Sequence, residues 1–474
     1  MAAIPRSVGG LVRRSHRSLY SPTVARHDWV DGRLPATRPS GMSVMKKATL
    51  IVSVTMAALV AGGGQGRVAA EGPEQSGWSR WRGRDAAGQG GEASFPVAWS
   101  ADAWAWKADL PGIGHASPVI WQDHVYTASA DEPAGLRYLL CHELAPGKRL
   151  WSREIPGPVD RHHTQNSSAS GSVAADSHGI YWLWGTRENV RLEAVSHEGQ
   201  PRWHIDLGPF ASEHGFGGTP TVCGDLVIVP LEQDGPGLVI GIDGVTGKER
   251  WRLPRDGADK AAYSTPLVIE RAEGAEVICT SHGHGLYALD PTTGRVLWEN
   301  RCFPRRTVSS PIQVAGLLIG TSGDGGGNNL LVAVKPPDAA SAESTVAYSI
   351  DKSAAPYVPT PLESRGRLYL WGDRGVVTCV HAADGSPLWK GRVGGNYSAS
   401  PIALGGRIIN VSSDGEVVVI ADGESFEVLG RTPLGEETRA TPAVAGAWLL
   451  FRSASHLWAL PIVDHSTTRG ADGD

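Results

Sequence analysis

Two pairs of neighbouring histidines are the first residues in this sequence to consider as metal ligands. They are His162-His163 and His282-Gly-His284. A zinc site needs three or four Cys, His or carboxylate ligands at short, regular spacings. Neither pair has a cysteine or a third histidine at such a spacing. We interpret both pairs as loop histidines on a solvated rim and assign no metal ligands.

The glycine-rich stretch 323–329 is the best candidate for a calcium or phosphate loop. It contains one carboxylate, Asp324, followed by Asn328 and Asn329, and no acidic ligand comes after them. Calcium needs several oxygen ligands, so this set is too small. The stretch also lacks the lysine and the helix of a phosphate-binding loop. We therefore expect an ordinary hairpin loop.

Catalytic residue types are present without the spacing that would bring them together. Asp109, His115 and Ser117 are the types found in hydrolytic triads, but no nucleophile elbow is recognisable. The five cysteines lie far apart, without an adjacent pair or a C-x-x-C motif, and we interpret them as small buried hydrophobic residues rather than a disulfide framework. They are Cys141, Cys223, Cys279, Cys302 and Cys379. No catalytic residue is assigned.

A repeated phrase defines the elements that must position any site. The phrase is an apolar strand, a turn that ends in glycine, and a tryptophan four residues later. Repetition at roughly 40–50 residues with short strands is typical of propeller blades. Because these tryptophans recur once per blade, we expect them to pack between blades. They occur as Gly147/Trp151, Gly199/Trp203, Gly247/Trp251, Gly294/Trp298 and Gly385/Trp389.

A second phrase, a hydroxyl residue before proline, marks the start of each repeat. Proline suits the first residue of a strand because no N–H is needed there. One start is degenerate, with Ser170-Gly171 in the expected place, which brings the count to eight. The other seven are Ser117-Pro118, Thr219-Pro220, Thr265-Pro266, Ser310-Pro311, Thr360-Pro361, Ser400-Pro401 and Thr441-Pro442.

The last repeat lacks its fourth strand, and the segment around Trp106 supplies one without a blade of its own. We predict an all-β fold, an eight-bladed β-propeller of four-stranded antiparallel blades, whose N-terminal strand completes the last blade beside 457–460. The predicted organisation is an extension at 1–41, either disordered or due to a start codon placed too early, a signal peptide at 42–70, a leader segment at 71–104, the propeller at 105–462 and a disordered tail at 463–474.

The segment from Met42 to Ala70 has a basic start, an apolar run of 48–62 and small residues at its end. This order is typical of a secretory signal peptide, and the apolar run is short for a membrane span of about 20 residues. We expect export to the periplasm or another extracytoplasmic location after cleavage, with a retained anchor as the alternative. A net charge of −5 argues against a nucleic-acid partner.

The phrase Leu289-Asp290-Pro-Thr-Thr-Gly294-Arg-Val-Leu-Trp298 resembles the repeat of pyrroloquinoline-quinone-type propellers. That family includes quinone-binding dehydrogenases and BamB-type outer-membrane assembly proteins that bind no quinone. The resemblance covers about 78–462, and Trp78-Ser-Arg-Trp81-Arg-Gly83 is similar to the opening of exported members. For a dehydrogenase it implies a vicinal disulfide, an aromatic floor, a calcium and an aspartate base. This sequence has no Cys-Cys pair, and no motif of the calcium or base region is recognisable.

The residues just before the inner strands are the candidate binding site, because loops at one face of a rigid scaffold usually carry function. We predict a non-catalytic envelope scaffold, a monomer without cofactor, that binds an extended peptide or a protein loop there and can associate peripherally with a membrane. The alternative is a pyrroloquinoline-quinone-dependent alcohol or sugar dehydrogenase with calcium. The candidate residues are His115, Asn166, His214, Tyr263, Arg306, Tyr357, Tyr397 and Arg439, with Gly218 and Ser309 in equivalent places.

Overall fold

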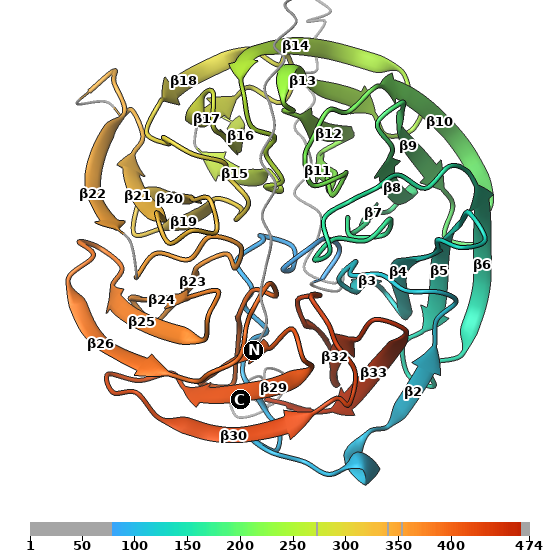
Figure 1. Cartoon of the computed structure of the whole chain (residues 1–474), viewed down its shortest axis with the longest axis vertical. Helices are drawn as coiled ribbons and strands as arrows, with labels where there is room; N and C mark the ends of the chain where they lie inside the picture. Colours follow the sequence, from blue (N-terminus) through green and yellow to red (C-terminus); the bar gives the residue numbers. More distant parts are fainter. Residues whose placement is uncertain (1–77, 272–273, 339–340, 352–353, 466–474) are drawn as a thin grey trace, which may run out of the picture. The chain divides into compact units, whose positions relative to one another are not determined.

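The computed structural model describes residues 78–271, 274–338, 341–351 and 354–465. These residues form eight four-stranded antiparallel sheets arranged around a ring (Figure 1). The predicted eight-bladed propeller is therefore confirmed. The predictions for 1–41 and 42–70, and the parts of the leader and tail at 71–77 and 466–474, lie outside the described residues.

Each of the first four blades is a run of consecutive hairpins, from an inner strand at the axis to an outer strand at the circumference. Blade 1 comprises β3 (Val119–Trp121), β4 (His124–Asp131), β5 (Leu136–Glu143) and β6 (Arg149–Pro156). Blade 2 comprises β7 (Ala174–Asp176), β8 (Gly179–Gly185), β9 (Val190–Val195) and β10 (Pro201–Gly208). Blade 3 comprises β11 (Thr221–Cys223), β12 (Leu226–Leu231), β13 (Gly235–Asp243) and β14 (Glu249–Ala258). Blade 4 comprises β15 (Leu267–Arg271), β16 (Gly274–Ser281), β17 (Gly285–Leu289) and β18 (Val296–Asn300).

The remaining blades follow the same plan, except that the last takes its outer strand from the start of the ring. Blade 5 comprises β19 (Ile312–Val314), β20 (Leu317–Ser322), β21 (Leu330–Lys335) and β22 (Thr345–Asp351). Blade 6 comprises β23 (Leu362–Ser364), β24 (Arg367–Trp371), β25 (Val376–His381) and β26 (Pro387–Arg392). Blade 7 comprises β27 (Ile402–Leu404), β28 (Arg407–Val411), β29 (Glu416–Ala421) and β30 (Val428–Pro433). Blade 8 comprises β31 (Ala443–Ala445), β32 (Trp448–Arg452), β33 (His456–Pro461) and β2 (Trp106–Asp109).

The seam between β2 and β33 closes the ring. The strands are antiparallel, with Trp106 opposite Ala459 and Asp109 opposite His456, and they lie side by side at the lower right of Figure 1. The predicted place of Trp106 beside 457–460 is confirmed. Because the ring is closed, every blade packs between two neighbouring blades, and no end of the ring is exposed.

Aromatic side chains of the outer strands lock six of the eight blades to the next one. The indole of Trp203, on the outer strand of blade 2, packs on Gly247 in the last turn of blade 3, where a Cβ atom would lie 2.6 Å from the ring. The indole nitrogen of Trp298 has no hydrogen-bond partner among the described residues, because the following blade, blade 5, has Lys335-Pro-Pro in place of the glycine turn. Six side chains donate a hydrogen bond to a carbonyl of the next blade's turn: Trp106 to Leu144 (3.0 Å), Trp151 to His197 (2.9 Å), Trp203 to Gly244 (3.0 Å), Trp251 to Pro291 (2.6 Å), Tyr348 to Ala382 (2.9 Å) and Trp389 to Gly423 (3.0 Å).

A belt of hydroxyl side chains encircles the axis where the inner strands begin. In seven steps around the ring, the backbone N–H of a belt residue donates to the hydroxyl of the next blade: Ser117 to Ser172 (3.0 Å), Ser172 to Thr219 (3.1 Å), Thr265 to Ser310 (2.8 Å), Ser310 to Thr360 (2.9 Å), Thr360 to Ser400 (2.9 Å), Ser400 to Thr441 (3.0 Å) and Thr441 to Ser117 (2.9 Å). Between blades 3 and 4, Thr221 Oγ1 instead donates to Pro266 O at 3.0 Å.

The belt corrects the predicted start of blade 2. The belt residue there is Ser172, two residues before β7, as in every other blade; Ser170-Gly171 is displaced from that position. The hydroxyl, rather than proline, is therefore the feature that all eight starts share. Val173 takes the place of proline, because φ near the start of a strand is accessible to any residue.

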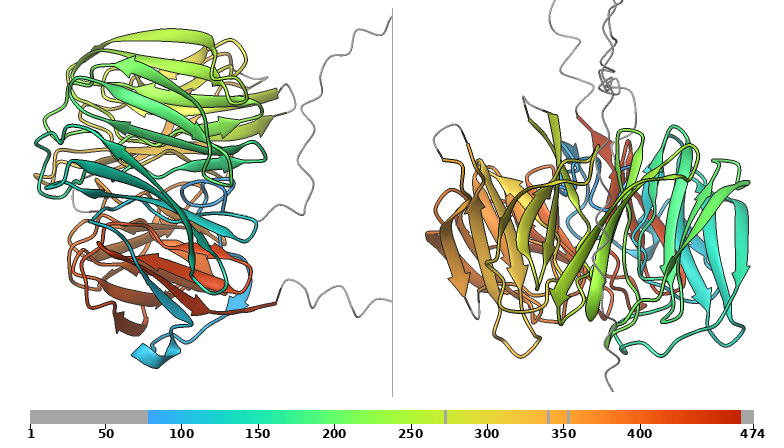
Figure 2. Two further views of the ribbon diagram at one scale, coloured as in Figure 1. Left: turned by 90° about the vertical axis from the view of Figure 1, so that its right-hand side faces the viewer. Right: turned by 90° about the horizontal axis from the view of Figure 1, so that it is seen from above.

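The leader is an integral part of the ring. Its first part, 78–92, lies across the inner strands, where the backbone oxygens of Trp78, Ser79 and Gly88 accept N–H groups at the free edges of β3, β7 and β27. We call this segment the plug. Further on, β1 (Ala93–Ser94) pairs with β34 (Val463–Asp464), which lies in the stretch assigned from the sequence to the tail. In the side views of Figure 2 the blue leader and red β34 lie toward the same face.

Buried Arg82 fixes the plug. Its guanidinium is fully buried and donates to Pro361 O (3.1 Å) and Pro401 O (3.3 Å), at the starts of two inner strands, and to Ala87 O (3.3 Å) within the plug. Beyond β1, the 3-10 helix η1 (Ala101–Ala103) leads to the seam, and Trp104 packs against Trp458 with ring centroids 5.3 Å apart. None of the described helices is long and apolar enough to cross a membrane.

Candidate binding cup

A cup of about 1020 Å³ occupies the ring's axis. It opens on the mouth face, which carries the loops leading into the inner strands and the loops between second and third strands. The glycine turns lie on the opposite, turn face. Seven of the eight predicted site residues line the cup: His115, Asn166, His214, Tyr263, Tyr357, Tyr397 and Arg439. Arg306 lies behind this wall, in contact with His214.

The base of the cup combines the hydroxyl belt with one side chain of the plug. All eight belt residues line the cup, and so does Trp81. The sequence pattern predicted the ring of strand starts. It did not predict Trp81, which lies in the leader, before β1 and β2. The sequence feature that could have indicated Trp81 is the motif Trp78-Ser-Arg-Trp81-Arg-Gly83, to which no role was assigned.

The three cup tyrosines are neutral and differ in how far they face the cup. Burial raises the pKa of Tyr263 to about 12, and the Tyr263 hydroxyl is hydrogen-bonded to Ser212 Oγ. Burial also raises the pKa of Tyr357 and of Tyr397. Tyr397 is only 2% exposed and packs edge-on against Trp371, with ring centroids 5.3 Å apart. Replacing Tyr397 by alanine would therefore disrupt the hydrophobic core between blades 6 and 7 as well as the cup.

His214 lines the wall of the cup and is hydrogen-bonded to Arg306, which lies behind it. Arg306 donates through Nη1 to His214 Nε2 (3.1 Å) and through Nη2 to Glu213 Oε2 (3.0 Å). Burial and the Arg306 charge lower the pKa of His214, so its imidazole is neutral near pH 7. His163 stacks on it with ring centroids 5.0 Å apart and an interplanar angle of 11°. This arrangement presents a flat aromatic surface rather than an acid–base pair.

His115 is also held neutral. Burial, with the charges of Arg452 and Arg439, lowers its pKa to about 3. A general base for neutral pH needs a pKa near 7, so His115 is unsuited to that role. The triad types do not meet either, because Asp109 lies in β2, within 3.2 Å of His456, while His115 and Ser117 line the cup.

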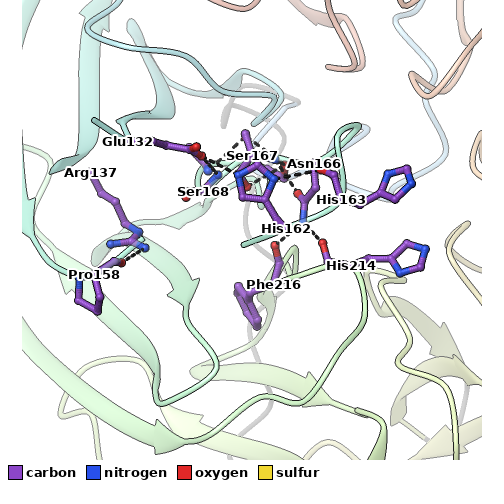
Figure 3. A network of polar contacts seen from close by, with 12 residues as sticks. Glu132, Arg137, Pro158, His162, His163, Asn166, Ser167, Ser168, His214 and Phe216 are labelled. Carbon is purple, nitrogen blue, oxygen red and sulfur yellow. Dashed lines mark hydrogen bonds and ion pairs between the residues drawn. The ribbon is translucent and has the colours of Figure 1, made fainter. Parts of the chain in front are cut away.

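Asn166 organises the loop of blade 2, as Figure 3 shows. Its Nδ2 donates to the carbonyl oxygens of His214 (2.8 Å) and Phe216 (3.1 Å), which ties this loop to the one leading into blade 3. Nearby, Glu132 Oε1 accepts from Ser168 N (2.9 Å) and lies 2.8 Å from His162 Nε2. The amide donors of Asn166 are thus committed to shaping the rim.

Two arginines of blade 6 belong to the cup and were missed by sequence reasoning. Arg374 lies in the β24–β25 loop, and Arg392 ends β26 opposite Val376. Both side chains are exposed, and among the described residues neither has a carboxylate within ion-pair distance. The prediction considered only the residues just before inner strands, whereas Arg374 lies in a loop between a second and a third strand and Arg392 is the last residue of an outer strand.

The carboxylates of the cup are already bound. Asp373 accepts the backbone N–H groups of Tyr357 (2.8 Å) and Val358 (2.9 Å) on its two oxygens. Asp324 accepts from Arg305 Nη1 (2.6 Å) and Gly326 N (2.9 Å). The stretch 323–329 joins β20 to β21, so the predicted hairpin loop is confirmed.

The residues of the cup do not fit a calcium-bound quinone. Calcium needs several free oxygen ligands, and both cup carboxylates are engaged. None of the five cysteines lines the cup, so no paired thiols lie over it. Among the described residues, no three His, Cys, Asp or Glu side chains are grouped as metal ligands. His282 and His284 have separate partners, Asp259 and Glu299.

Comparisons with known proteins agree with this architecture. The family model described as outer membrane protein assembly factor BamB matches residues 143–336 and 328–462. BamB from Moraxella catarrhalis is 17% identical, covers 75% of this chain and 99% of its own, and has a TM-score of 0.53. A quinohemoprotein alcohol dehydrogenase from Comamonas testosteroni is 13% identical, covers 76% of each chain, and has a TM-score of 0.56. At these identities the two structures show a shared fold alone. A search of curated protein sequences found no match.

Proposed function

We propose, from the premise that this chain belongs to the BamB-like family of pyrroloquinoline-quinone-type propellers, that it is an exported, non-catalytic scaffold that binds a polypeptide segment in the cell envelope. Its binding site is the axial cup. The predicted signal peptide supports export, and the description of the family model supports an envelope role. Fold and activity are separate matters in such superfolds, so the proposal depends on the cup itself.

One observation carries the proposal: the cup is large, rigidly framed and chemically unreactive. Its volume lies at the upper end of ligand-sized pockets. Its imidazoles at His115 and His214 are neutral, its phenols are protonated, and its carboxylates are engaged. Such a surface offers hydrogen bonds and stacking, and no paired nucleophile and base.

A photo-crosslinking experiment tests this proposal. A photoreactive amino acid replaces exposed Asn396, which lines the cup, and in a matched variant it replaces exposed Thr292 in a turn of the opposite face. Irradiation of the producing cells should give a discrete polypeptide adduct at position 396 and none at position 292. Adducts at both positions alike, or at neither, would reject binding at the cup.

The alternative is a quinone-dependent dehydrogenase, and a cofactor-binding assay distinguishes the two. If the protein is a scaffold, purified protein mixed with pyrroloquinoline quinone and calcium should show no bound quinone spectrum and no alcohol-dependent dye reduction. A stoichiometric quinone spectrum with turnover would replace the scaffold proposal by the enzyme.

A further inference from the structure

The cup is closed at its base. The plug bonds to the free edges of three inner strands, and buried Arg82 anchors it to Pro361 and Pro401. Trp81 of the plug lines the cup within the belt of hydroxyls. A polypeptide therefore cannot thread along the axis from one face to the other, and whatever enters the mouth must end or turn inside.

The wall of the cup has an excess of unpaired positive charge. Arg374 lies in the β24–β25 loop and Arg392 at the adjacent end of β26, and among the described residues neither has a carboxylate within ion-pair distance. Asp324 is itself paired with Arg305. Asp373 lies next to Arg374 and offsets one of the two arginine charges, so one positive charge remains in excess. Arginine binds carboxylates through two parallel N–H groups, so this wall favours an anionic group.

The belt adds hydrogen-bond donors at the base. Seven of its hydroxyls, those of Ser117, Ser172, Thr219, Ser310, Thr360, Ser400 and Thr441, each accept one backbone N–H. None of the belt hydroxyls donates to another residue of the described ring. A hydroxyl keeps one O–H donor when it accepts, so the base offers donors that need oxygen acceptors.

We propose that the cup receives the free C-terminal end of a polypeptide, with its carboxylate directed to Arg374 and Arg392. This inference rests on the proposed function. A chain end fits a closed cup because it needs no exit, and it always carries a carboxylate. Its last carbonyl groups supply the acceptors that the belt lacks, and the flat surface of His163 and His214 suits a terminal side chain with a ring. Capture of a terminal carboxylate is a general mode of peptide recognition.

Two bead libraries of random hexapeptides test this proposal. In one, each peptide is attached through its N-terminus and ends in a free carboxylate; in the other, the same peptides end in an amide. Fluorescently labelled protein is applied to both. We expect enriched beads in the acid library, and at least tenfold weaker binding when the selected sequences are remade as amides.

Charge variants provide the matched control. R374A/R392A removes two charges from the cup, and R149A/R295A removes two from exposed positions beside the glycine turns of the other face. Only the cup variant should lose binding to the selected acid peptides, with unchanged circular dichroism in both.

The outcomes distinguish failure of the chain-end inference from failure of the proposed function. Equal enrichment of acid and amide beads, with loss in R374A/R392A, would overturn the chain-end inference and leave the cup as a polypeptide site. Equal loss in the two double variants would overturn the role of the cup arginines. An absence of enriched beads in both libraries would overturn the inference and the proposed function together.

Discussion

The lock between adjacent blades predicts a specific cost for adding one methyl group at Gly247. Gly247 has φ +72°, and a Cβ atom there would lie 2.6, 2.7 and 3.0 Å from three atoms of the Trp203 indole. G247A therefore has two costs. The left-handed backbone costs about 1–2 kcal/mol for a residue with a Cβ, and overpacking against a ring that is held by its bond to Gly244 costs about 1–3 kcal/mol more.

A second glycine isolates the packing part of that cost. Gly316 has φ +79°, and a Cβ atom there would meet nothing within 4 Å. G316A should therefore lose only about 1–2 kcal/mol, while G247A loses about 2–5 kcal/mol. Equilibrium urea unfolding followed by circular dichroism measures both.

A double-mutant cycle then identifies the partner. In a W203A background, G247A should cost no more than G316A does, because the clash is gone. Equal losses for G247A and G316A in the unmodified protein would refute the lock between blades 2 and 3. An undiminished cost of G247A in the W203A background would show that Trp203 is not the opposing group.

Two further predictions concern the plug and the seam. R82A removes three hydrogen bonds from a buried cation, each contributing about 1.5–3 kcal/mol; trypsin should then cleave within 78–92 at a concentration that spares the unmodified protein and R84A, and equal resistance of R82A would contradict the anchoring role. Although burial opposes it, hydrogen bonds from His456, Ser453 and Ser455 lower the pKa of Glu436 to about 2, from an ordinary 4.5. The stability from this lowered pKa is complete above pH 4.5 and is lost as the pH falls toward 2. The decrease in melting temperature from pH 5 to pH 3 should be smaller in E436Q than in the unmodified protein, with exposed E437Q as the control; the same decrease in all three proteins would contradict it.

The sequence predicts the ring well because its signals are local and repeated. A glycine that must adopt positive φ and a tryptophan that must reach the next blade occur at a fixed spacing in five repeats, and the hydroxyl residues at the strand starts bring the count of units to eight. The seam was predictable for the same reason: Trp106 belongs to the repeat but has no blade before it, and blade 8 has no outer strand of its own.

The cup was predicted only in part, because it is assembled from positions that differ between blades. Residues before inner strands could be found by register, and seven of the eight candidates line it. Arg374 lies in a β24–β25 loop and Arg392 at the end of an outer strand, and neither position is part of the repeated phrases. Trp81 depends on long-range contacts of the plug with strand edges. The start of blade 2 was predicted two residues too early, at Ser170-Gly171, because the proline that marks the other seven starts is absent there.

The seam has a consequence for how the chain reaches its native state. The belt bond from Thr441 N to Ser117 Oγ, and the bond from Arg452 Nη2 to Ala128 O, each join residues 324 positions apart. The strand that completes the circle is synthesised first and finds its partner last. Contacts of such separation form slowly. Until β33 has been synthesised, β2 remains an unpaired strand edge, and such an edge is prone to association with other chains.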